Sequence, residues 1–191
     1  ASGGMYFSVA PTLTQVSLAE YFTSASASLQ ISADRRTLSS ISNDNHKSGL
    51  VGVYFSDEVR EVTFRIVSTL RSSIMFGAQP MLTDDVRDNL GPNQHPGWGV
   101  LSEGKALDGK DIRIQADNVG TLELGGDIPI NHEPLAPGDL VTVRVSVSST
   151  EASIQFAING LWSATHSMTP GYSYGIVANL MDSGDTVAIE Y

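Results

Sequence analysis

The sequence contains no cysteine among its 191 residues. This absence excludes disulfide bonds, thiol nucleophiles, iron–sulfur clusters and cysteine-based structural zinc sites. The sequence also has no Asn-x-Ser/Thr sequon, and its start lacks the charged-then-apolar pattern of a signal peptide. Together these absences favour an intracellular, cytoplasmic location.

Basic residues are scarce. The chain has 11 lysine and arginine residues against 21 aspartate and glutamate residues, which gives a formal net charge of −10. A field of this sign repels phosphate, so we expect no nucleic-acid partner and a preference for a neutral or basic protein or peptide. Long apolar runs are also missing: none approaches the roughly 18 residues that a membrane span needs, so we expect no membrane insertion.

Helical patterning is confined to Thr14–Phe22. Ser17 and Glu20 have the spacing of a capping box, and the apolar residues around them suit one side of a helix. The pattern predicts one helix in an N-terminal segment.

Alternation of apolar and polar residues dominates the rest of the chain. In Leu140–Ser148 every second residue from Val141 is a valine, and Ser153–Ile158 and Val62–Ser68 alternate in the same way. This period is typical of antiparallel strands with one buried face. Asn159-Gly160 predicts a type I′ hairpin turn. Further strands are expected at Ser28–Ser32, Thr37–Ile41, Leu50–Ser56, Ser73–Ala78, Ile112–Ala116, Thr121–Leu124, Leu161–Thr165, Tyr174–Leu180 and Thr186–Tyr191. Many short strands with little helix predict an all-β sandwich or barrel.

A series of short motifs occurs in the order found in the SPRY domain family. The series is Ile74-Met75-Phe76-Gly77-Ala78, Gly97-Trp98-Gly99-Val100, Glu103–Gly109, Leu135–Val143, Ser153–Gly160, Gly171–Ala178 and the closing strand Val187–Tyr191. The chain therefore resembles a SPRY domain from about Ser28 to Tyr191. It departs from the family pattern at Gly175, where proline is common after the tyrosine, and at Thr142, where glycine is common.

The resemblance implies a concanavalin A-like antiparallel β-sandwich over residues 28–191. Residues 1–27 are then an N-terminal extension, in which residues 1–4 resemble a cloning remnant. The implied activity is non-catalytic recognition of a protein or peptide by loops at one edge of the sandwich.

The resemblance also suggests contact residues for the partner. Arg87 and Leu90 lie in the long loop before the Trp-Gly motif, with Leu90 as an apolar anchor and Arg87 facing an acidic side chain. Further contacts are expected in two other loops and at the motif tryptophan, at Asn43, Asp44, Trp98, Met181 and Asp182.

Signatures of catalysis and of cofactor binding are missing. The chain has no Gly-x-Ser-x-Gly elbow, no phosphate-binding glycine loop, and no second histidine after His132-Glu133 to complete a zinc-protease helix. The acidic residues of Asp84–Asp88 and Asp182–Asp185 lack EF-hand spacing. We expect no enzyme activity, no metal and no cofactor.

Three alternatives remain open at this point. One is a lectin-like carbohydrate-binding module, with Trp162 or Tyr172 as the aromatic platform. Another is an assembly module of a larger protein that makes contact through edge strands. The last is a hydrolase on the same sandwich, which would need paired carboxylates across one face.

Overall fold

The computed structural model describes residues 16–18, 21–43, 47–70, 74–81, 98–101, 106–107, 135–162, 165–168 and 170–191. For residues 16–18, 47, 98–101, 106–107 and 166 it describes the backbone alone. These residues form strands and turns and contain no helix. Among them there is accordingly no helix long and apolar enough to cross a membrane.

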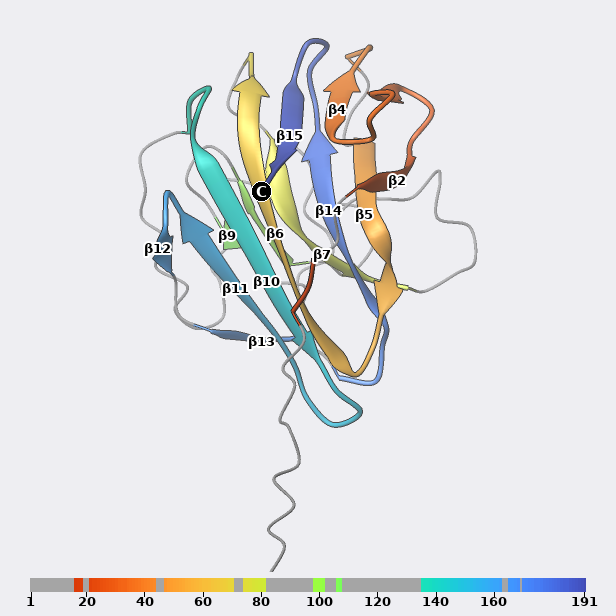
Figure 1. Cartoon of the computed structure of the whole chain (residues 1–191), viewed down its shortest axis with the longest axis vertical. Helices are drawn as coiled ribbons and strands as arrows, with labels where there is room; N and C mark the ends of the chain where they lie inside the picture. The colour runs from red at the N-terminus through yellow and green to blue at the C-terminus, as the bar shows by residue number, and fades with distance from the viewer. Residues whose placement is uncertain are drawn as a thin grey trace, which may run out of the picture.

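The strands form two facing sheets (Figure 1). The first is nine-stranded, with the order β12-β11-β10-β6-β15-β4-β3, while β1 pairs with β6 and β13 with β11. Its strands are β1 (Val16–Leu18), β3 (Leu29–Ile31), β4 (Thr37–Ser40), β6 (Glu58–Ser68), β10 (Leu140–Val147), β11 (Ala152–Ile158), β12 (Leu161–Trp162), β13 (His166–Met168) and β15 (Thr186–Glu190).

The second sheet is six-stranded, with the order β2-β5-β14-β7-β8-β9. Its strands are β2 (Phe22–Ala25), β5 (Lys47–Phe55), β7 (Met75–Pro80), β8 (Trp98–Leu101), β9 (Ala106–Leu107) and β14 (Tyr174–Leu180). The pairs in both sheets are antiparallel, except that β1 runs parallel to β6.

The core lies between the sheets. Phe64 from the nine-stranded sheet packs between Phe22 and Phe76 of the other sheet, with ring centroids 6.2 and 5.1 Å away. All three are fully buried, as are the inward valines of β10. The predicted alternation of β10 is therefore confirmed: its odd-numbered residues face the core and its even-numbered residues face outward.

The expected Asn159-Gly160 turn is also confirmed. It joins β11 to β12, and both residues have positive φ, 48° and 84°. The side-chain Oδ1 of Asn159 accepts a hydrogen bond from the Leu140 amide at 2.9 Å, which ties the turn to the neighbouring β10.

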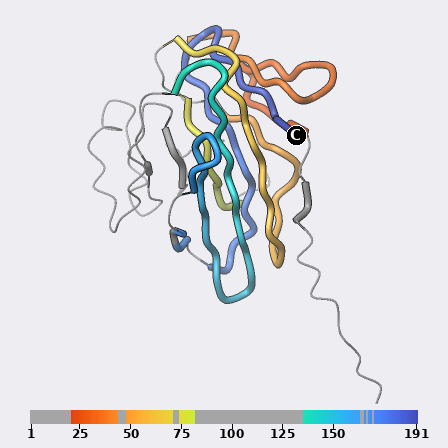
Figure 2. Tube along the Cα trace, turned by 60° about the vertical axis from the view of Figure 1, so that its left-hand side comes forward, coloured from red at the N-terminus to blue at the C-terminus, as the bar shows by residue number. Residues whose placement is uncertain are grey.

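The prediction of a helix at Thr14–Phe22 is wrong for the part of this segment that the structure describes. Val16–Leu18 forms β1 against β6, and Phe22 begins β2 against β5. The sandwich thus contains strands that precede Ser28, and Phe22 is part of its core. Figure 2 shows the C-terminus beside the orange strands that follow β2, where the Ile189 amide donates to the Arg36 carbonyl at 2.8 Å. The predicted strands at Ile112–Ala116 and Thr121–Leu124 lie outside the described residues.

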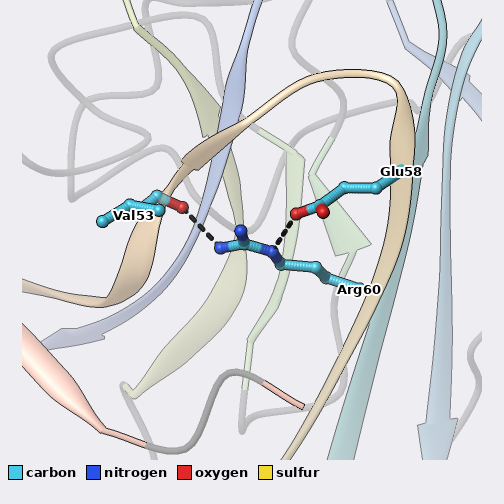
Figure 3. Close-up of polar contacts among 3 residues, drawn as sticks. All are labelled: Val53, Glu58 and Arg60. Carbon is cyan, nitrogen blue, oxygen red and sulfur yellow. Dashed lines mark hydrogen bonds and ion pairs between the residues drawn. The ribbon is translucent and has the colours of Figure 1, made fainter. Parts of the chain in front are cut away.

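The chain crosses from one sheet to the other between β5 and β6. The crossing turn contains Asp57 at a positive φ of 56°. Arg60 stabilises this corner: its Nη1 donates to the Val53 carbonyl at 2.8 Å, its Nε pairs with Glu58, and its guanidinium lies 4.5 Å from the centroid of the Phe55 ring. Figure 3 shows the two polar contacts converging on the arginine.

Candidate functional site

Three loops meet at the upper end of the sandwich in Figure 1. Their described residues are 40–43 after β4, 68–70 at the end of β6 and 181–185 between β14 and β15, and we call them the loop cluster. The backbones of Ser40 and residues 184–185 are paired, since Gly184 donates to Ser40 and Ser40 to Asp185, each at 2.9 Å. The Ser68 hydroxyl donates to the Gly184 carbonyl at 2.5 Å and brings in the third loop.

Asp185 organises this cluster. Its side chain is fully buried. Oδ1 accepts a hydrogen bond from the Leu70 amide at 3.0 Å, and Oδ2 accepts from the amides of Met181 and Asp182 at 3.3 and 2.9 Å. Burying a carboxylate is costly unless hydrogen bonds replace its water, and three backbone donors provide that replacement here. One side chain therefore fixes two loops relative to each other.

Asn43 joins the remaining loop to the same assembly. It is exposed, and its Oδ1 accepts a hydrogen bond from the Ser183 amide at 2.9 Å. Asn43, Met181 and Asp182 are thus brought together, although they come from segments more than a hundred residues apart in the sequence. Their expected role as partner contacts stays a prediction.

Asp182 is placed differently from what the sequence suggested. A direct contact with a partner requires an accessible side chain, whereas that of Asp182 is 1% exposed and its amide donates to Asp185. Met181 is half-buried. The β14–β15 loop therefore presents Ser183 and Gly184 as its exposed residues.

The other candidate contacts are outside the loop cluster or outside the described residues. Asp44, Arg87 and Leu90 lie outside the described residues. The Trp98 backbone begins β8 and pairs with Ala78, three residues along β7 from the strand end nearest the cluster. The expected role of these four residues as partner contacts therefore stays a prediction.

Two apolar side chains that sequence reasoning missed stand beside Asp185. Ile41 follows Ser40 and is 59% exposed, and Leu70 donates its amide to Asp185 and is 69% exposed. The sequence signal was weak: each is a single apolar residue just beyond a strand, among polar neighbours. Within the described loop cluster no residue is basic, and both carboxylates are buried. The cluster therefore presents an apolar and neutral polar surface.

The class of protein follows from this architecture: a two-sheet β-sandwich whose loops gather at one end. Among solved structures the chain is similar to a human SPRY domain (18% identity, TM-score 0.62), with 85% of this chain and 94% of that chain covered. It is also similar to the SPRY domain of human HERC1 (14% identity, TM-score 0.58; 84% and 91% covered) and to the PSpry domain of TRIM65 (14% identity, TM-score 0.54; 98% and 100% covered).

The fold is therefore the SPRY fold, as the sequence motifs suggested. No protein-family model matches the sequence, and no curated protein matches it.

Proposed function

We propose that the chain is a non-catalytic recognition module that binds a protein or peptide through the loop cluster. The observation that carries the proposal is the arrangement around Asp185. Its three hydrogen bonds hold the loops in one geometry, and the same geometry leaves Ile41 and Leu70 exposed. A preformed surface binds more tightly because less conformational entropy is lost on association.

The chemistry of the surface indicates the kind of partner. Burial of Ile41 and Leu70 would contribute about 1–2 kcal/mol each, as for other aliphatic side chains removed from water. Asn43 and Ser183 offer neutral polar groups beside them. The net charge of −10 favours a neutral or basic partner over an acidic one. The SPRY resemblance supports the same general role. We also propose that the protein acts in the cytoplasm.

The proposal also includes the contacts suggested by the sequence. Asp44, Arg87, Leu90 and Trp98 extend the partner surface beyond the described loop cluster. Met181 contributes through its half-buried side chain. Asp182 acts indirectly, because its backbone takes part in the hydrogen bonding around Asp185.

Selection from a displayed peptide library tests this proposal. Selected peptides are titrated against the parent protein and against the double variant Ile41→Ser/Leu70→Ser. Both residues are exposed, so we expect the double variant to fold and to lose about tenfold or more in affinity. The matched control is Val53→Ser. Val53 is 61% exposed and lies near the end of β5 that is farther from the loop cluster.

The control variant is expected to bind as the parent does. Equal affinity of the parent and the double variant would refute the loop cluster as the binding surface. Failure of the parent to select any peptide would count against peptide recognition altogether.

A further inference from the structure

A groove of about 550 Å³ lies on the outer side of the nine-stranded sheet, at the end opposite the loop cluster. It is formed by the β10–β11 hairpin and β13, near the lower end of the molecule in Figure 1. Ser146 in this groove pairs with Val59, near the start of β6, whereas the loop cluster adjoins Ser68 at the other end of the same strand. The two surfaces are therefore separate.

Hydroxyl groups dominate the groove. Ser146, Ser153 and Ser167 occupy equivalent positions on β10, β11 and β13, so their side chains form a row across three strands. Paired residues of adjacent strands point to the same face of a sheet. None of these three hydroxyls makes a hydrogen bond to the described part of the chain, and each has its donor and acceptors available. Thr150 and Thr165 add further hydroxyls to the lining, whereas the Ser148 hydroxyl donates to the Glu151 carbonyl at 3.1 Å within the hairpin turn.

The groove carries little charge. Glu151, in the hairpin turn, is the one ionisable residue among the lining residues that the structure describes. A single carboxylate disfavours phosphate, sulfate and other anions. Hydroxyls that can both donate and accept match a neutral ligand that is itself rich in hydroxyls.

Trp162 lies on the same face of the sheet, two rows of paired residues away from the serine row. Arg144 lies two residues before Ser146 on β10, and its guanidinium is held by Glu61 at 2.7 Å and lies 4.0 Å from the centroid of the Trp162 ring. Trp162 pairs with Ala157 on β11 and is 42% exposed. Successive rows on one face are about 7 Å apart, so the Trp162 backbone lies about 14 Å from the hydroxyl row, and its ring contacts Arg144, which lies one row closer to the serines. Because Glu61 offsets the charge of Arg144, the surface between the Trp162 ring and the hydroxyl row is close to neutral.

We propose that the hydroxyl groove and the Trp162 ring together bind a neutral oligosaccharide. The sugar hydroxyls exchange hydrogen bonds with the serine row, and the apolar face of a sugar ring packs against the tryptophan. A sugar chain extends over the distance between the two features, which a single small molecule in the groove does not. This site acts independently of the loop cluster, so the protein carries two separate binding surfaces.

An array of immobilised neutral oligosaccharides, probed with the intact chain, tests this proposal. Binding to a hit is then measured in solution for Trp162→Ala and for Ser153→Arg, which fills the middle of the hydroxyl row. We expect each variant to lose about tenfold or more in affinity. Leu161→Ala is the matched control because Leu161 is the strand neighbour of Trp162, points to the other side of β12 and is 81% exposed.

Thermal unfolding of each variant verifies that the fold is retained. The Ile41→Ser/Leu70→Ser variant should keep sugar binding, which separates this site from the proposed peptide surface. The proposal is overturned if no neutral sugar is bound, if acidic glycans alone are bound, or if Trp162→Ala and Ser153→Arg bind as tightly as the parent.

Discussion

At the residue scale, Asp185 combines complete burial with three backbone hydrogen bonds. In Asp185→Asn, the amide nitrogen takes the place of one oxygen and faces backbone donors whichever way it is turned. At least one amide then loses its acceptor, and the remaining bonds lose their charge assistance. We expect the free energy of unfolding to fall by about 2 kcal/mol, measured by urea denaturation.

Asp57→Asn is the matched control for that substitution. It makes the same chemical change at an exposed position in the β5–β6 turn, and asparagine tolerates the positive φ of 56° found there. Its effect should stay within about 0.5 kcal/mol. If the two variants lose equal stability, the hydrogen bonds of Asp185 are not what holds the loops.

Gly175 explains one departure from the SPRY motif pattern. A Cβ atom at this position would lie 2.6 Å from Cδ1 of Leu50 and about 3.0 Å from the Tyr54 ring. Two side chains of the neighbouring strand β5 therefore occupy the space that a side chain at position 175 would need. The sequence showed the departure, but its cause is a contact with a segment more than a hundred residues earlier.

At the element scale, Arg60 secures the corner where the chain passes from the six-stranded to the nine-stranded sheet. Arg60→Met removes its hydrogen bond to Val53 and its ion pair with Glu58 and leaves the Val53 carbonyl without this donor. We expect a loss of about 2 kcal/mol in unfolding free energy, measured in urea. Arg65→Met is the comparison: Arg65 lies on the same strand as Arg60, but its ion pair with Glu190 of β15 is exposed and worth about 0.5 kcal/mol. Equal losses in the two variants would contradict this role for Arg60.

The same scale shows what the sequence could predict. Strands with one buried face, such as β10, can be predicted from the alternation of apolar and polar residues. The Asn159-Gly160 turn can be predicted from two residues alone, because both adopt positive φ and these residue types favour it. The Thr14–Phe22 segment misled because its capping-box spacing is also local, whereas its strands gain stability from β6 and β5, which come later in the chain. Tertiary pairing outweighed local propensity there.

The candidate site follows the same division. Loop residues such as Asn43 and Met181 could be selected by their place between predicted strands together with the SPRY resemblance. The role of Asp185 could not be predicted, since its donors, at positions 70, 181 and 182, become neighbours only in the folded chain. The exposed tryptophan at the edge of the nine-stranded sheet was visible in the sequence, but the register that places three serines beside one another was not.

At the scale of the whole molecule, two tyrosines of the six-stranded sheet lower the stability of the fold at alkaline pH. Burial raises the pKa of Tyr174 far above its ordinary value, with the nearby Tyr172 adding to the effect. Burial also raises the pKa of Tyr54 from its ordinary value of 10.0, although the hydrogen bond from Gln79 opposes this. Both groups therefore hold their protons more tightly in the folded state than in the unfolded state.

The direction of the pH dependence follows from that difference. Below about pH 9 both states are protonated at these tyrosines, and their contribution to stability is fully present. As the pH rises through 10, the unfolded chain releases protons that the folded chain retains, so the free energy of unfolding falls. Urea denaturation between about pH 9 and about pH 11 should show this decline in the parent, and Tyr174→Phe and Tyr54→Phe should each flatten it, Tyr174→Phe more strongly. Curves that run parallel to the parent in both variants would show that other groups control alkaline unfolding and that the phenols keep their contact with water in the folded state.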